Sequence, residues 1–464
     1  MAQAAQPARR LGVNIFDTSR PLWLIYLIFL APLILSNLLQ TASQTMGSIF
    51  LGRMIGTNAL AAVSAVFPVV FLLFSFLIGI ASGSTVLIGQ AYGAQDEHRV
   101  KKVAGTVLGA TLGFGIIVAI LGALLSPVML KLLGTPPNII AQSDAYARVI
   151  FLTSPVLFPY LAYTTFLRGT GDSTTPFYFL AIATALAIFF TPAFIAGWFG
   201  LPHLGVVSVA VAALLAQGIS FAALLIRLHA INHPLKFDRE TARDMLVDWR
   251  IFWTVLRIGI PTGVQVVMVS LAEVAVISFV NHFGSSATAA YGAVNQVVSY
   301  VQFPAISIGI TASIFGAQCI GARREDMLTH VVRTAVGLNY AIGGVIIVLC
   351  YIFAWQIMGW FIVDPHTLQI AHTLLMITLW SYLLFGNSAV MSGVMRSSGA
   401  VLWPMINGIF AIWCVEVPSA YILMHHFGLN GVWMGYPISF IVVVLLQYTY
   451  YTFFWKKRTH ERLA

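Results

Sequence analysis

Long apolar runs recur along the whole of this 464-residue chain, and they leave few folds open to it. A helix needs about 20 consecutive apolar residues to cross the hydrocarbon core of a bilayer. Twelve runs of this kind follow one another, separated by short polar stretches. The predicted spans are residues 22–50, 60–88, 102–130, 142–167, 175–199, 204–229, 251–281, 288–316, 328–358, 368–395, 401–425 and 430–455.

The composition of the chain restricts its class further. Charged residues make up only 8% of it and hydrophobic residues 59%. A soluble domain carries about 25% charged residues, so this chain lacks the polar residues to cover a water-facing surface. The period-two alternation of a transmembrane β-barrel does not recur in its short segments. The sequence therefore predicts an all-α integral membrane protein.

Two short motifs show that the chain repeats itself. The sequence Gln-x-x-Gly-Ala occupies residues 90–94 and again residues 318–322, which lie 228 residues later. The same offset aligns Gly56 with Gly284, Ala61 with Ala289, Arg168 with Arg396, Gly171 with Gly399 and Pro176 with Pro404. Each half holds six predicted spans. Because six is even, both halves enter the membrane in the same direction, as a parallel repeat.

The repeat also predicts the domain organisation. We expect an N-terminal segment (1–21), a first six-helix lobe (22–230), an interlobe loop (231–250), a second lobe (251–455) and a basic tail (456–464). Transporters built from repeats bind substrate at the interface of the lobes and move one lobe against the other. A channel is the alternative interpretation, but no repeated selectivity-filter segment is evident. The doubling therefore favours alternating access.

The distribution of Lys and Arg predicts the topology. If the N-terminus is cytoplasmic, 21 of the 24 basic residues fall at cytoplasmic ends of spans, and only Arg53, Lys131 and Arg148 do not. This asymmetry is the positive-inside rule. We therefore expect both termini in the cytoplasm and the chain in a bacterial-type plasma (inner) membrane. The net charge of +9 is explained by topology and indicates no nucleic-acid partner.

Several longer motifs resemble those of the multidrug and toxic compound extrusion (MATE) family. They include "FLRGTGDSTTP", "GIPTGVQVV", "ATAAYGAVNQV" and "GLNGVWMG", in the expected order. The resemblance covers the chain from about residue 21 to residue 455. It implies two six-helix lobes in a V-shaped arrangement, and export of organic, often cationic compounds driven by inward flow of H⁺ or Na⁺.

Only two acidic residues fall well inside the predicted spans. They are Glu273, in "MVSLAEVAVISF", and Glu416, in "AIWCVEVPSAY". A carboxylate in hydrocarbon costs at least about 2.5 kcal/mol, so an intramembrane acid is a functional candidate by default. Both are candidate ion-coupling groups. The alternative is a structural role, as a protonated acid bonded to a neighbouring helix or, for Glu416, as part of the kink at Pro418.

The chain departs from the family at the positions where members carry acids. Gly47 stands where many members have an Asp in the first span, and Val269 where others have a Glu. Glu273 lies one helical turn beyond Val269, on the same face. Asn387 stands near the position of a further common acid. These differences centre the predicted coupling site on Glu273 in the second lobe, and they leave H⁺ and Na⁺ open as the coupling ion, with no other cofactor.

Polar side chains inside the spans are candidates for a substrate cavity. The i, i+3, i+7 spacing of Asn37, Gln40 and Gln44 places them on one helix face. The further candidates are Gln265, Asn295, Gln296, Gln302 and Asn387. The alternative for each is an interhelical hydrogen bond worth about 1 kcal/mol.

The leading prediction is a secondary-active exporter of cationic amphipathic compounds that functions as a monomer among membrane lipids. A lipid-linked saccharide flippase of the same superfamily is the alternative, disfavoured because the spans hold almost no basic residues for a phosphate. We expect no enzyme, because no nucleophile–base pair or metal-binding spacing is present. No nucleotide-binding motif indicates ATP-driven transport.

Overall fold

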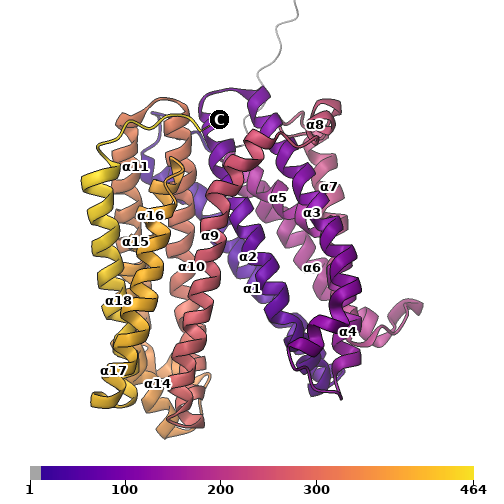
Figure 1. The fold of residues 1–464 in the computed structure, drawn as a ribbon, viewed down its shortest axis with the longest axis vertical. Helices are drawn as coiled ribbons and strands as arrows, with labels where there is room; N and C mark the ends of the chain where they lie inside the picture. The colour runs from indigo at the N-terminus through magenta and orange to yellow at the C-terminus, as the bar shows by residue number, and fades with distance from the viewer. Residues whose placement is uncertain (1–11, 464) are drawn as a thin grey trace, which may run out of the picture. The chain divides into compact units, whose positions relative to one another are not determined.

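The structure is a computed structural model that describes residues 12–463 as a set of helices (Figure 1). The helices are α1 (Leu22–Met54), α2 (Thr57–Gly93), α3 (Glu97–Leu132), α4 (Ile140–Leu152), α5 (Ser154–Gly169), α6 (Thr174–Ala196), α7 (Ser208–Ala230), α8 (Arg239–Asp244), α9 (Trp249–Asn281), α10 (Ser285–Gly321), α11 (Glu325–Leu338), α12 (Gly344–Ile352), α13 (Ala354–Gly359), α14 (Pro365–Thr378), α15 (Tyr382–Ser397), α16 (Leu402–Phe410), α17 (Val417–Phe427) and α18 (Leu429–Tyr450).

Shorter helical segments interrupt or extend these helices. Three are π-helical, at Asn339–Gly343, Ala411–Glu416 and Tyr451–Trp455. Three are 3₁₀-helical, at Trp198–Gly200, Gly205–Val207 and Leu379–Ser381. No strand occurs between residues 12 and 463. The all-α class predicted from the apolar runs is confirmed.

The predicted spans are also present. Eleven helices of the described chain are long and apolar enough to cross a membrane, and the pair α4 and α5 brings the number to twelve if it forms one span. That pair is bent by 51°. At the bend, the Thr153 hydroxyl donates to the Ile150 carbonyl oxygen at 2.7 Å, and Pro155 follows without an N–H to continue the helix. The protein is therefore an integral membrane protein.

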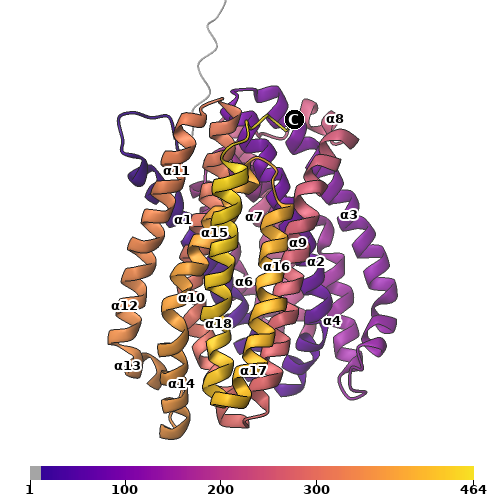
Figure 2. The same ribbon diagram turned by 60° about the vertical axis from the view of Figure 1, so that its left-hand side comes forward.

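The chain folds as two compact units, each built mainly from one sequence repeat. Unit 1 holds residues 12–14 and 31–257, and unit 2 holds residues 15–30 and 258–463. Within unit 2, α10, α15 and α18 pack side by side (Figure 2). Buried side chains of α9, α10, α14 and α18 form its core, including Val276, Val298, Leu375 and Trp433.

The units differ from the expected lobe boundaries at the start of α1 and of α9. Residues 22–30 pack in unit 2 and residues 249–257 in unit 1. The Tyr26 hydroxyl donates to the Val331 carbonyl oxygen at 3.1 Å, and its ring meets Phe315 at 4.7 Å. Such contacts join residues as far as 305 positions apart. Lobe boundaries inferred from the ends of apolar runs therefore do not take them into account.

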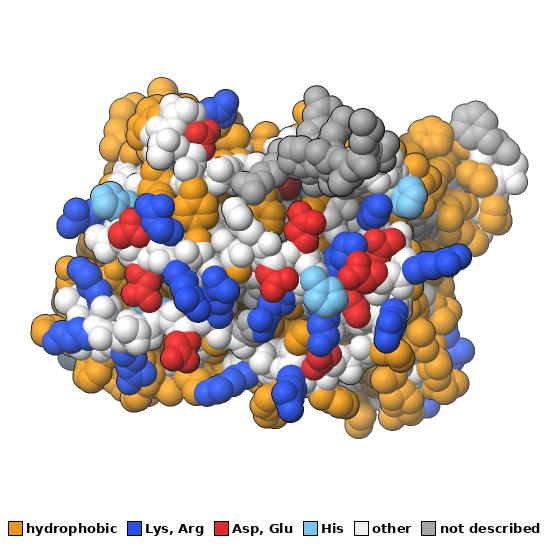
Figure 3. Space-filling view, turned by 90° about the horizontal axis from the view of Figure 1, so that it is seen from above, with side chains coloured by type: hydrophobic (Ala, Val, Ile, Leu, Met, Phe, Trp, Pro, Cys, Tyr) orange, Lys and Arg blue, Asp and Glu red, His pale blue; other side chains and the backbone are white. Residues whose placement is uncertain are grey.

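The interlobe loop is docked on α3 within unit 1. Lys101 on α3 contacts Asp238 at 3.0 Å and Glu240 at 2.8 Å. Glycines on the same helix allow a close backbone approach, because a Cβ at Gly109 would lie 2.0 Å from the Met245 carbonyl oxygen. Acidic and basic side chains gather on the face seen in Figure 3.

Asp238 stabilises this loop through its ionised carboxylate. Burial raises the pKa of the carboxyl, but hydrogen bonds from Thr241 and Lys101 outweigh burial and lower the pKa to about 2. The carboxylate also caps α8, accepting from the Thr241 backbone N–H at 2.9 Å. Because the folded-state pKa lies below the usual value, this stabilisation is present above about pH 4 and is lost as the pH falls toward 2.

We predict that Gly109→Ala releases the docked loop. The added methyl group overlaps the Met245 backbone, and overpacking of this kind costs about 1–3 kcal/mol. Limited proteolysis of the detergent-solubilised protein should then cut faster within residues 231–248. Gly113→Ala is the matched control, since nothing lies within 4 Å of a Cβ on that residue. Equal cleavage of the two variants would contradict the docking.

Candidate functional site

Glu273 on α9 is held by two tyrosine hydroxyls from other helices of unit 2. Its Oε2 accepts from the hydroxyl of Tyr291 on α10 at 2.6 Å and from that of Tyr436 on α18 at 3.1 Å. The two hydroxyl oxygens are 3.0 Å from each other. Both tyrosines are buried. An acid within an apolar span thus has the hydrogen-bond partners that the cost of burial requires.

Glu416 lies in the same part of unit 2, at the last residue of the π-helical segment Ala411–Glu416. Its side chain is 4% exposed and has Glu273 as an electrostatic neighbour, and the nearby Ser439 hydroxyl donates to the Ala411 carbonyl oxygen at 3.1 Å. Pro418 follows, and its missing N–H leaves a carbonyl of the preceding turn without its usual partner. A π-helical turn at this point is therefore consistent with the proline, and such turns are frequent at functional sites.

Tyr382 is the third tyrosine of this site. It begins α15 directly after the 3₁₀ break at Leu379–Ser381 and is 5% exposed. Glu273 and Glu416 are its electrostatic neighbours, and Gln302 is a hydrogen-bond partner. We call Glu273, Glu416, Tyr291, Tyr382 and Tyr436 the acid–tyrosine cluster.

The sequence indicated the two acids of the acid–tyrosine cluster but not its tyrosines. Glu273 and Glu416 are 143 positions apart, and nothing in their spacing indicates a contact. In the sequence the three tyrosines look like the many other aromatic residues of the spans. A buried tyrosine hydroxyl needs a hydrogen-bond partner. A tyrosine within an apolar span is therefore a sequence feature that indicates a polar neighbour on another helix.

The predicted cavity residues of unit 2 have different surroundings. Asn295 is a hydrogen-bond partner of Tyr291, and Gln302 of Tyr382, so both border the acid–tyrosine cluster. Gln296 is exposed. The Gln265 Nε2 lies only 2.7 Å from where a Cβ of Gly408 would be, so the glycine makes room for this amide against α16.

Asn387 belongs to a separate amide cluster. Its Oδ1 accepts from Asn339 Nδ2 at 3.2 Å, and its Nδ2 donates to the Tyr340 hydroxyl at 2.6 Å. Asn339 Nδ2 also donates to the Leu383 carbonyl oxygen at 3.0 Å. Gly386 accommodates the Asn339 side chain, since a Cβ there would lie 1.9 Å from its Oδ1. Both ends of the Asn387 amide therefore have protein partners.

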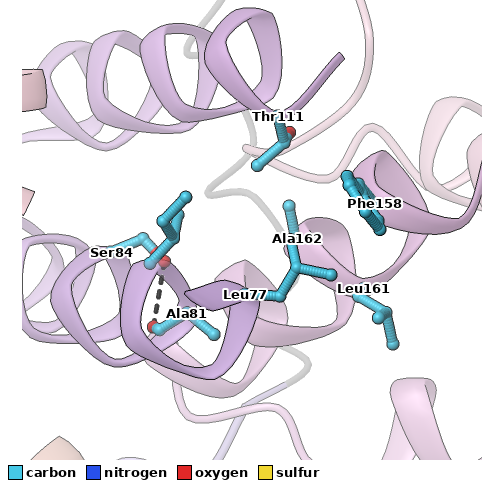
Figure 4. A pocket seen from close by; sticks show the side chains of 8 residues that line it. Leu77, Ala81, Ser84, Thr111, Phe158, Leu161 and Ala162 are labelled. Atoms are coloured by element: carbon cyan, nitrogen blue, oxygen red, sulfur yellow. Dashed lines mark hydrogen bonds between the residues drawn. The ribbon is translucent and has the colours of Figure 1, made fainter. Parts of the chain in front are cut away.

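The polar stripe on α1 lies in unit 1. Asn37, Gln40 and Gln44 fall on one helix, with Gln40 and Gln44 exposed and Asn37 half-buried. A pocket inside the same unit is formed by other residues (Figure 4). It is mainly apolar, lined by Leu77, Ile80, Ala81, Ser84, Thr111, Phe158, Leu161 and Ala162. The Ser84 hydroxyl is bonded to the Ala81 carbonyl oxygen at 3.0 Å.

Comparison with known proteins places the chain in a family. The sequence matches the MatE family model over residues 32–193 and 261–422, one match in each repeat. It is 52% identical over 448 residues to the Probable multidrug resistance protein YoeA of Bacillus subtilis, covering 96% of this chain and 97% of the relative. It is 26% identical over 440 residues to the Probable multidrug resistance protein NorM of Thermotoga maritima, covering 92% of each.

A solved structure supports the same fold. A mutant of the Vibrio cholerae MATE transporter VcmN superposes with a TM-score of 0.86 and 18% identity, covering 93% of this chain and 97% of the other. The fold and these relatives describe a helical membrane transporter. The chain belongs to the MatE family, as its resemblance to MATE motifs predicted.

We predict that Asn387→Ala destabilises the protein by about 1–3 kcal/mol, because it leaves the buried Asn339 amide without one of its acceptors and Tyr340 without its donor. Gln296→Ala removes an amide of similar chemistry from an exposed site and should change stability by less than about 0.5 kcal/mol. Thermal unfolding in detergent measures both. Similar midpoints for the two variants would show that the amide cluster is not structural.

Proposed function

We propose that the chain is a multidrug efflux antiporter that exports organic, cationic amphipathic compounds in exchange for H⁺ or Na⁺. The proposed cycle is alternating access of the two lobes. The acid–tyrosine cluster carries the proposal, because it makes the buried Glu416 and the half-buried Glu273 electrostatic neighbours within the apolar spans of one repeat. The relatives from Bacillus subtilis and Thermotoga maritima are named as probable multidrug resistance proteins, which supports the same class of substrate.

The chemistry of the cluster explains how ion flow drives export in this proposal. Ionising a carboxylate in a water-poor site is unfavourable, so a proton or a metal cation that neutralises it binds well there. Glu273 and Glu416 are electrostatic neighbours, so loading one acid makes ionisation of the other less unfavourable. An ion released on the other side leaves a negative site that attracts a cationic compound.

The proposal also includes the membrane, the topology and the oligomeric state of the protein. We place it in the bacterial inner membrane with both termini in the cytoplasm, on the asymmetry of Lys and Arg. Each chain carries both repeats and its own acid–tyrosine cluster, so we propose that it functions as a monomer among membrane lipids. Its partners are small organic compounds rather than nucleic acids.

A lipid-linked saccharide flippase is the second candidate. Its substrate carries a phosphate, for which basic residues inside the spans are the natural partners. The acid–tyrosine cluster is acidic instead, which favours a cation as the substrate.

The test is uptake of a fluorescent lipophilic cation into inverted vesicles. We expect an acidified lumen to drive uptake in the wild type, or a Na⁺-loaded lumen if Na⁺ is the coupling ion. Glu273→Gln and Glu416→Gln should reduce uptake to the rate without a gradient, because each removes one ionisable group. Glu461→Gln, at an exposed position in the tail, should transport like the wild type.

The variants must be present at equal levels in the vesicles. Gradient-driven uptake that survives in Glu273→Gln would show that coupling does not depend on this acid. Absence of gradient-driven uptake in the wild type would sink the exporter proposal, and flipping of a labelled lipid-linked saccharide would be the next assay.

A further inference from the structure

We propose that Tyr291 and Tyr436 are positioning residues that transmit the protonation state of Glu273 to helix α18. The proposal rests on the proposed role of Glu273 in ion coupling, with H⁺ as the ion that it carries. It adds to that role the step by which protonation of the Glu273 carboxyl on α9 changes the packing of α18.

The starting point is the triangle of oxygen atoms formed by Glu273 Oε2 and the two hydroxyls. Its three sides measure 2.6 Å, 3.1 Å and 3.0 Å. All three lengths are compatible with O–H···O hydrogen bonds. Each side of the triangle needs one proton to be such a bond.

The number of protons depends on Glu273. Each phenol supplies one proton. When Glu273 is ionised, both phenols donate to Oε2, and the contact between Tyr291 and Tyr436 holds no proton. When a proton from water binds Oε2, three protons serve three contacts: Glu273 donates to Tyr291, Tyr291 to Tyr436, and Tyr436 back to Oε2. The ring of hydrogen bonds therefore closes only around the protonated acid.

Helix α18 contacts Tyr291 at two points. The Tyr291 ring stacks on Trp433, with centroids 5.7 Å apart and planes 9° apart, and its hydroxyl meets that of Tyr436. Trp433 and Tyr436 are three residues apart on α18 and so share a face. Only the hydroxyl contact depends on the proton. Loss of the proton therefore removes the direct hydroxyl contact with Tyr436 and leaves the stack of Tyr291 on Trp433.

Other titratable groups face the same triangle. Glu416 of the π-helical segment and Tyr382 of α15 are electrostatic neighbours of Tyr436. Asn295 is a hydrogen-bond partner of Tyr291 but does not titrate. An observed pH response must therefore be assigned to Glu273 or Glu416 by substitution.

Trp433 offers a direct optical readout. It is fully buried, and its indole N–H has no hydrogen-bond partner within the described residues 12–463. Its emission is therefore governed by the packing against Tyr291 and by nearby charge. The chain has 11 tryptophans, so the signal of Trp433 is isolated as the difference between each protein and the same protein carrying Trp433→Phe.

The experiment records this difference emission against pH for the purified full-length chain in lipid nanodiscs. We expect one pH-dependent step in the wild type and in Glu416→Gln. The step should be lost in Glu273→Gln, which cannot ionise. It should fall to the smaller response to the Glu273 charge in Tyr436→Phe and Tyr291→Phe, which keep their rings but break the triangle. Tyr300→Phe, at a half-exposed tyrosine of α10, is the control that should keep the step.

Two tyrosine variants are used so that the test still gives a result if one of them does not fold. A step of wild-type size in either folded variant would overturn the proposal, and so would a wild type without a step. Gradient-driven uptake by the same variants separates this failure from that of the proposed function. If Glu273→Gln loses uptake while Tyr436→Phe keeps both uptake and the step, coupling through Glu273 stands and transmission through the tyrosines is wrong.

Discussion

The cost of leaving a polar group without a partner in hydrocarbon determines the helical architecture of this protein and the surroundings of most of its buried polar groups. For the backbone it permits helices, whose N–H and C=O groups are paired within one segment. Where a helix is interrupted, side chains complete the pairing. The Tyr351 hydroxyl does so at the break before α15: it accepts from the Trp380 backbone N–H at 3.0 Å and donates to the Met376 carbonyl oxygen at 3.3 Å.

The same cost determines where acids are found. Asp144 lies inside a span and is paired with Arg148 at 2.9 Å, one helical turn away. Glu273 has no such neighbour on its own helix and takes hydroxyl donors from α10 and α18 instead. Asp144 also accepts from the Ser126 hydroxyl of α3, but its charge is balanced by a cation, whereas no basic side chain of the described residues pairs with Glu273. This difference makes Glu273 the stronger candidate for coupling.

The two repeats share a fold but not their chemistry. At the 228-residue offset, the π-helical segment Asn339–Gly343 corresponds to an uninterrupted part of α3, and the segment Ala411–Glu416 to part of α6. The acid–tyrosine cluster occurs in unit 2, and at the same offset unit 1 has Thr45 in place of Glu273 and Val63 in place of Tyr291. Duplication thus provided two scaffolds, of which the second carries the ionisable groups.

The amino-acid sequence by itself determined the membrane class, the spans and the repeat, because span length and hydropathy are properties of single segments. It also singled out Glu273 and Glu416, since an acid in an apolar run is visible without a fold. Only the tertiary structure decided that these acids are neighbours, that Tyr291 and Tyr436 hold Glu273, and that Asn387 is committed to Asn339 and Tyr340. The reason is physical: such contacts join residues far apart in the chain, and helix packing brings them together.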